Sequence, residues 1–116
     1  MESILDTIKK MLGIDTEDDS FDGDIITLIN PIIYALAQMG IGPSTGFIVV
    51  DKNNTWTEYI GSIPFNLEGV KTYIYLKTKL IFDPPTNTTT IDAMTRSAQE
   101  LEWRMMLEVE TNNLEG

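Results

Sequence analysis

The sequence contains no cysteine and no histidine. Without cysteine there are no disulfide bonds and no thiolate metal sites. Without histidine the chain lacks the commonest general base and the commonest transition-metal ligand. Ser–His–Asp and Cys–His constellations are therefore impossible here. We predict that the chain is not an enzyme, has no cofactor and holds no metal.

Basic residues are also scarce, with 8 Lys and Arg against 18 Asp and Glu and a net charge of −10. Binding to nucleic-acid phosphates needs Lys and Arg, so we do not expect the chain to hold DNA. No apolar run approaches the roughly 18 residues of a membrane span, and the first residues lack the pattern of a signal peptide. We expect a protein made in a cytoplasm, or exported only as part of a particle, with no membrane partner.

The acidic residues concentrate in residues 15–24, DTEDDSFDGD, which hold 6 of the 18 acids. Asp18, Ser20 and Asp22 match the first ligand positions of a calcium-binding EF-hand loop, but Ile29 stands where a bidentate Glu is required. We therefore expect no calcium site. Instead, Ser20 or Asp22 is expected to cap the helix that follows, with the acids favouring its positive N-terminal end.

Apolar residues recur at three- and four-residue steps in long stretches, which predicts helices. The expected fold is one mainly α domain over residues 1–116, a small helical bundle of four principal helices. These lie near 2–12, 22–39, 66–82 and 90–110, with the first inside an N-terminal segment 1–14 and a disordered tail at 111–116. In the first helix Gly13 is the stop, and Lys9 lies off the apolar face.

The last two helices are separated by a stop and a restart. Asn66 is the expected N-cap of the third helix, and Pro84 and Pro85 end it. Thr89 and Asp92 have capping-box spacing for the fourth. Its apolar seam is expected to pack on the 70–74 face of the third helix, and Glu100 and Arg104 to form an i,i+4 pair. The seam consists of Ile91, Met94, Ala98, Leu101 and Met105.

Residues 44–65 form the expected projecting insert. Phe47–Val50 is rich in strand formers and predicts a short strand. Two interpretations of residues 55–61 stay open: the returning strand of a hairpin, or one helical turn in which Thr55 and Glu58 form a capping box and Gly61 ends the turn. We favour the helical turn.

The second helix is apolar around most of its circumference, so one face is expected to meet another copy of the chain. Trp103 and Arg104 are of types enriched at interfaces, although Trp103 equally suits the edge of the core. The candidate residues for subunit or partner contact are Ile8, Ile29, Ile33, Trp56, Tyr59, Trp103 and Arg104.

The run VKTYIYLKTKLIFDPP (70–85), followed by a helix containing ELEWR (100–104), resembles the small head–tail connector proteins of long-tailed bacteriophages and prophages, also called adaptor or DNA packaging proteins. The resemblance is best over 66–110 and weaker over the N-terminal helices.

The resemblance implies a viral structural protein that joins a ring of about a dozen copies under the portal protein. Such a ring extends the DNA channel and docks a tail-side stopper or tail-completion protein. DNA passes through without specific binding, which suits an acidic chain. The expected location is the host bacterial cytoplasm before assembly and the neck of the virion afterwards.

A second hypothesis is a small acidic helical binding or regulatory module that acts as a monomer or dimer. Its motive is a possible methionine-bearing groove formed by Met94, Met105 and Met106, because methionine-rich surfaces adapt to varied partners.

Overall fold

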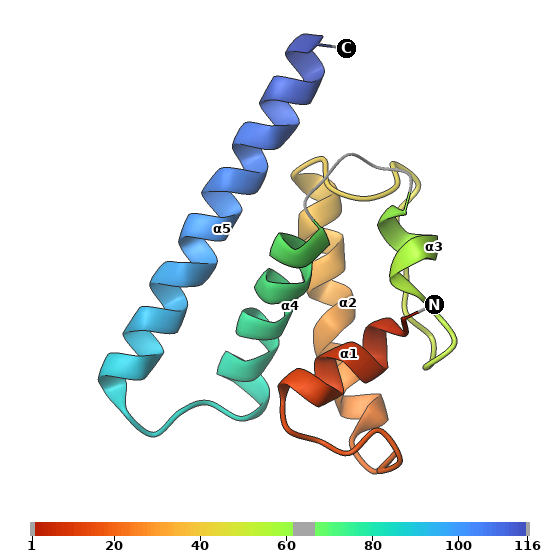
Figure 1. Ribbon diagram of the computed structural model, residues 1–116, viewed down its shortest axis with the longest axis vertical. Helices are drawn as coiled ribbons and strands as arrows, with labels where there is room; N and C mark the ends of the chain where they lie inside the picture. The colour runs from red at the N-terminus through yellow and green to blue at the C-terminus, as the bar shows by residue number, and fades with distance from the viewer. Residues whose placement is uncertain (1, 62–66, 116) are drawn as a thin grey trace.

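The computed structural model describes residues 2–61 and 67–115 as a bundle of five helices (Figure 1). The prediction of a mainly α fold is confirmed. The helices are α1 (Ile4–Met11), α2 (Asp22–Gln38), α3 (Trp56–Ile60), α4 (Leu67–Phe82) and α5 (Thr88–Glu115). The proposed cap Asn66 lies outside the described residues.

Helix α4 is the central element, because it contacts α1, α2 and α5. Helix α5 runs along one side of the molecule, while α1, α2 and α3 lie on the other side of α4 (Figure 1). The molecule measures 43 × 35 × 19 Å, so it is flat. Its thin dimension is about two helix diameters, which leaves room for only one continuous core.

Helix α1 starts at Ser3, whose hydroxyl accepts a hydrogen bond from the Asp6 backbone N–H at 3.2 Å. Gly13 follows the helix end with a φ of +82°, a conformation that suits glycine, so the predicted stop is confirmed. Lys9, which was predicted to lie off the apolar face, is nevertheless buried, with its side chain 1% exposed. Its long stem reaches past the helix end to the acidic segment, which periodicity alone does not show.

Helix α2 supplies the largest apolar share of the core, with Ile25, Ile29, Ile32, Ile33 and Leu36 buried. Its N-cap is Phe21, which makes no side-chain capping bond, so the expected cap by Ser20 or Asp22 was wrong. The Ser20 hydroxyl instead donates to the Asp18 carboxylate, and Asp22 pairs with Lys9.

The insert contains no β-strand within the described residues, so the predicted strand at 47–50 was wrong. The Asn30 side chain of α2 takes the place of a partner strand. Its amide donates to the Val49 carbonyl at 3.0 Å, and its carbonyl accepts from the Val49 N–H at 2.9 Å. Val49 is buried, while Ile48 and Val50 are 67% and 71% exposed. Exposed and buried residues alternate here as in a strand. The hydrogen bonds that a partner strand would make to the Val49 backbone come instead from the Asn30 side chain.

Residues 55–61 form the favoured helical turn, α3, and the hairpin alternative is wrong. Thr55 and Glu58 make the predicted capping box, and Gly61 is the C-cap. Backbone bonds from Ile4 to Asn54 and from Trp56 to Glu2 tie this turn to the start of α1. Residues 54–60 of the insert therefore fold against the core instead of projecting from it.

A tight corner joins α4 to α5 around Pro84 and Pro85, as predicted. The Thr89–Asp92 capping box was wrong, because α5 begins earlier. The Asn87 side-chain oxygen accepts from the backbone N–H groups of Thr89 and Thr90 at 2.8 and 3.3 Å. The helix then continues to Glu115, past residue 111, from which a disordered tail was expected.

The seam of α5 packs on α4 as predicted, with Ala98 and Met105 buried and Met94 and Leu101 packed against the core. One polar contact reinforces it. The Tyr73 hydroxyl donates to the Glu102 carboxylate at 3.0 Å, and burial together with this carboxylate raises the pKa of Tyr73 to about 12. Glu100 and Arg104 form the predicted ion pair at 2.8 Å on the solvent side.

Candidate functional site

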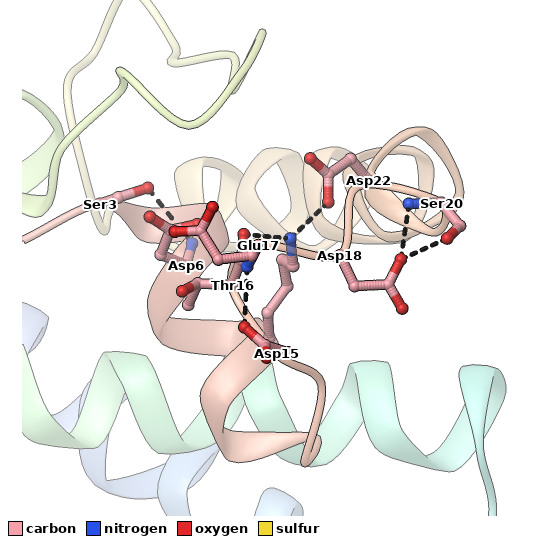
Figure 2. A network of polar contacts seen from close by, with 9 residues as sticks. Ser3, Asp6, Asp15, Thr16, Glu17, Asp18, Ser20 and Asp22 are labelled. Carbon is pink, nitrogen blue, oxygen red and sulfur yellow. Dashed lines mark hydrogen bonds and ion pairs between the residues drawn. The ribbon is translucent and has the colours of Figure 1, made fainter.

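The acidic segment, which sequence reasoning compared with a calcium loop, is occupied by contacts within the chain (Figure 2). Asp15 accepts the Glu17 N–H at 2.9 Å, and Asp18 accepts the Ser20 N–H at 3.0 Å. Asp22 forms an ion pair with Lys9 Nζ at 2.8 Å. No group of three or more Asp or Glu side chains suited to a metal ion occurs in the part of the chain that the structure describes.

Lys9 holds the acidic segment against α1. Besides the ion pair with Asp22, its ammonium donates to the Thr16 carbonyl at 3.1 Å. Asp22 keeps 26% of its side-chain exposure, so the pair is open to solvent only on the Asp side. Asp15, Asp18 and Asp22 therefore serve the local structure of this segment.

Five of the seven predicted contact residues lie in the protomer's own core. Ile8, Ile29, Ile33, Trp56 and Tyr59 are each at most 2% exposed. Trp56 donates its indole N–H to the Thr7 hydroxyl at 2.9 Å, and Tyr59 stacks on Phe47 with ring centroids 5.1 Å apart. These side chains are in the core of the subunit and not at its surface, and their part in an intermolecular contact stays a prediction.

Tyr59 shows how tightly this part of the core is closed. Its hydroxyl has no hydrogen-bond partner within the described residues, and burial raises its pKa. A Cβ added to Gly42 would come within 2.9 Å of the ring, and the φ of Gly42 is +98°. Only glycine suits this position, which fixes the path of the chain past Tyr59 just before the insert begins.

Trp103 and Arg104 are the two predicted contact residues that the structure leaves at the surface. The Trp103 residue is 62% exposed and the Arg104 side chain 66% exposed. Of the two interpretations of Trp103, a residue closing the core edge is therefore wrong. With Met106 and Leu107, which are 45% and 41% exposed, it forms an apolar strip that we call the α5 stripe.

A second exposed apolar surface lies between α2 and the insert, and we call it the α2–insert groove. It is a hollow of about 1050 Å³. Tyr34 and Ile48 line the groove, and these two residues are 65% and 67% exposed. Its lining is Asn30, Pro31, Tyr34, Ala37, Gln38, Ser44, Thr45, Gly46, Phe47 and Ile48.

The α2–insert groove contains no charged side chain, in a chain whose net charge is −10. Sequence reasoning missed Tyr34 and Ile48. The apolar circumference of α2 predicted that one face stays uncovered, but the insert decided which face. Strand-like alternation at 47–50, with buried Val49 between exposed neighbours, was the one local signal for Ile48.

The methionines do not form the common groove of the second hypothesis. Met105 is buried against the core, whereas Met106 is on the outer side of α5 with 45% exposure. Met94 packs against the core and is only partly exposed. The three side chains therefore cannot contact one partner together.

A further hollow of about 530 Å³ lies between α2, α4 and α5. It is lined in part by Tyr73, Lys77, Ile81 and Glu102, so its rim carries charges of both signs. No helix in the described residues is both long enough and apolar enough to cross a membrane.

The described side chains form a packed interior and leave apolar surfaces exposed on α5 and beside α2. Neither the curated proteins nor the solved structures give a match to the chain. The family model of the phage connector protein matches residues 4–112, which covers all five helices except the end of α5. The chain therefore belongs to the phage connector protein family and is a structural connector protein of phage.

Proposed function

We propose that this chain is a head–tail connector subunit that assembles with copies of itself into a ring under the portal protein. The ring extends the DNA channel and presents a docking surface to a tail-side stopper or completion protein. The family match over residues 4–112 carries the proposal. Assembled in the virion neck, the subunit needs no catalytic group, and its role is contact and shape.

The surface of the subunit supports assembly. Isolated apolar residues are common on soluble proteins, but a contiguous apolar surface marks an interaction site. Among the described residues, the α2–insert groove and the α5 stripe are surfaces of this kind. A subunit that needs two neighbours in a ring requires two contact surfaces.

The charge of the chain supports passage of DNA without binding. With a net charge of −10, the protein repels phosphate. The same charge makes subunits repel one another, so salt that screens the repulsion should strengthen assembly. We expect no measurable DNA binding at physiological salt.

The test is light scattering and negative-stain imaging over a protein and salt titration, with and without the cognate portal protein. We expect a ring, or an oligomer that grows with protein concentration and salt. A strict monomer under every condition, portal included, contradicts the proposal. Saturable DNA binding at physiological salt contradicts the role given to the charge.

A further inference from the structure

We infer that the α5 stripe of one subunit docks into the α2–insert groove of the next. This contact rests on the proposed self-assembly and specifies which surfaces meet. The occupant of the groove is thus a helix of a second copy, with Trp103 as its central anchor.

The absence of charge in the groove favours a second copy over a basic partner. A cationic ligand gains its affinity from acidic side chains, and the groove lining has none. Two copies that each carry −10 repel least where the touching surfaces are uncharged. The groove is therefore a place where this acidic chain can meet itself.

The α5 stripe has the spacing of a helix that binds in a groove. Trp103, Met106 and Leu107 stand at i, i+3 and i+4, which places them on one side of a helix. Tryptophan at the centre of such a contact is a common hot spot. Next to it, Arg104 is paired with Glu100 at 2.8 Å, which offsets its charge beside the stripe.

The stripe of a subunit cannot reach its own groove. Ala98 and Met105 direct one face of α5 to the core, and at 100° per residue the stripe lies on nearly the opposite face. Helix α4 contacts both α2 and α5 and lies between them (Figure 1). Because the buried face of α5 packs towards α4, the stripe on the other face is directed away from α4 and α2. Each copy therefore offers two different surfaces, and such a head-to-tail contact forms a ring where the rotation between copies closes and a filament where it does not.

The first experiment uses one charge variant on each surface, Trp103→Glu and Ile48→Glu, with Thr89→Glu as a control of equal charge at the far end of α5. All three sites are exposed, so we expect melting temperatures close to wild type. In sedimentation under assembling conditions, the two surface variants should each raise the concentration needed for assembly at least tenfold. Thr89→Glu should leave it unchanged.

Mixing the two surface variants distinguishes a head-to-tail contact from a symmetric one. Trp103→Glu keeps its groove and Ile48→Glu keeps its stripe, so the mixture can form one intact junction and should stop at a 1:1 dimer. Assembly of either variant alone at the wild-type concentration overturns the inference, while the proposed ring formation stands.

A second experiment uses the absence of cysteine, which means that any disulfide comes from introduced residues. Thr45→Cys lies at the groove and Leu107→Cys in the stripe. Mild oxidation of the mixture should give mainly the mixed disulfide dimer, at least fivefold over a Thr45→Cys and Thr89→Cys mixture. Adding Trp103→Glu to the Leu107→Cys variant should remove that excess.

Equal yields in the two cysteine mixtures overturn the inference whether or not rings form. If the wild type stays monomeric even with the portal protein, the proposed function fails separately, and the cross-link at high protein concentration still decides whether these two surfaces meet.

Discussion

Helices α1 and α5 are the shortest and the longest of the four principal helices, and they use their residues in opposite ways. Of the 8 residues of α1, 5 are buried, including Ile4, Leu5 and Ile8 at no more than 1% exposure. Helix α5 has 28 residues, yet Ala98 and Met105 are the only buried ones among its described side chains. Of these two helices, the longer one therefore has the smaller buried fraction.

Helices α1 and α5 differ in what holds them in the helical state. A helix of about 8 residues is unstable alone, so α1 exists because tertiary packing holds it. Helix α5 is long enough to be helical with little packing, and it keeps one face free. We connect that free face with assembly, whereas α1 contributes to the stability of the subunit itself.

The largest expected effect on stability comes from truncating one apolar side chain in α1, compared with the same kind of truncation in α5. Ile8→Ala removes a side chain that is 0% exposed and should lower the free energy of unfolding by about 2–5 kcal/mol. Leu107→Ala, at 41% exposure, should change it by less than about 0.5 kcal/mol. Urea denaturation of the monomer measures both. Equal losses in the two variants contradict the division of tasks.

The next effect concerns Lys9, the buried charged residue of α1. Lys9→Ala removes the ion pair with Asp22 and the bond to the Thr16 carbonyl. We expect a loss of about 2–3 kcal/mol, less than for a fully buried pair, because Asp22 can regain water. The control is Lys10→Ala at the exposed neighbouring position, with little expected change. A stability equal to that control shows that the acidic segment does not depend on Lys9.

A smaller effect is expected at the start of α5. Asn87→Ala leaves the Thr89 and Thr90 N–H groups without their side-chain acceptor and should cost about 1 kcal/mol. Thr89→Ala, at the cap position that spacing alone suggested, should cost nothing, because Thr89 is inside the helix and Ala is the better helix former. Thermal unfolding of the two variants decides between the caps, and a reversed order contradicts the structure.

The smallest effect is the pH dependence of the contact between Glu2, just before α1, and Lys71 of α4, whose charged groups lie 2.5 Å apart. The hydrogen bond from Lys71 lowers the pKa of Glu2 below its usual 4.5. The stabilisation is therefore complete above pH 4.5 and is lost as the pH falls through the lowered value.

Glu2→Gln tests this contact. Its destabilisation at pH 7 should be at most about 1 kcal/mol, since Glu2 is half exposed, and the difference from wild type should vanish in acid. Glu68→Gln is the control, because Glu68 is 3.5 Å from the same lysine and 80% exposed. A difference that persists unchanged in strong acid shows that the ion pair is not its cause.

Local sequence signals predicted the helices well. The periodicity of 22–39 and 66–82 gave helices within about two residues of their observed ends, and the Thr55–Glu58 box gave α3. These signals work because hydrogen bonds and caps within a helix join residues a few positions apart. The signals failed where the partner is distant in sequence, as with Asn30 and Val49, 19 positions apart.

The contact residues, too, could be predicted from the sequence only in part. From the sequence we selected Trp103 and Arg104, which are exposed, together with five residues that are buried. Hydrophobic residues suit a core and an interface equally, so residue type does not separate the two. Tyr34 and Ile48 became visible only once the insert was placed beside α2.

The sequence by itself determined the chemistry that is impossible here, the acidic charge, the helical class and the corner at Pro84 and Pro85. These follow from composition and from interactions between near neighbours. Only the tertiary structure decided that Lys9 is buried and that Val49 pairs with the Asn30 side chain. It also decided that the outer faces of α2 and α5 are exposed to solvent. The reason is physical: an apolar or charged residue acquires its role from what covers it, and in this fold the covering residues come from distant parts of the chain.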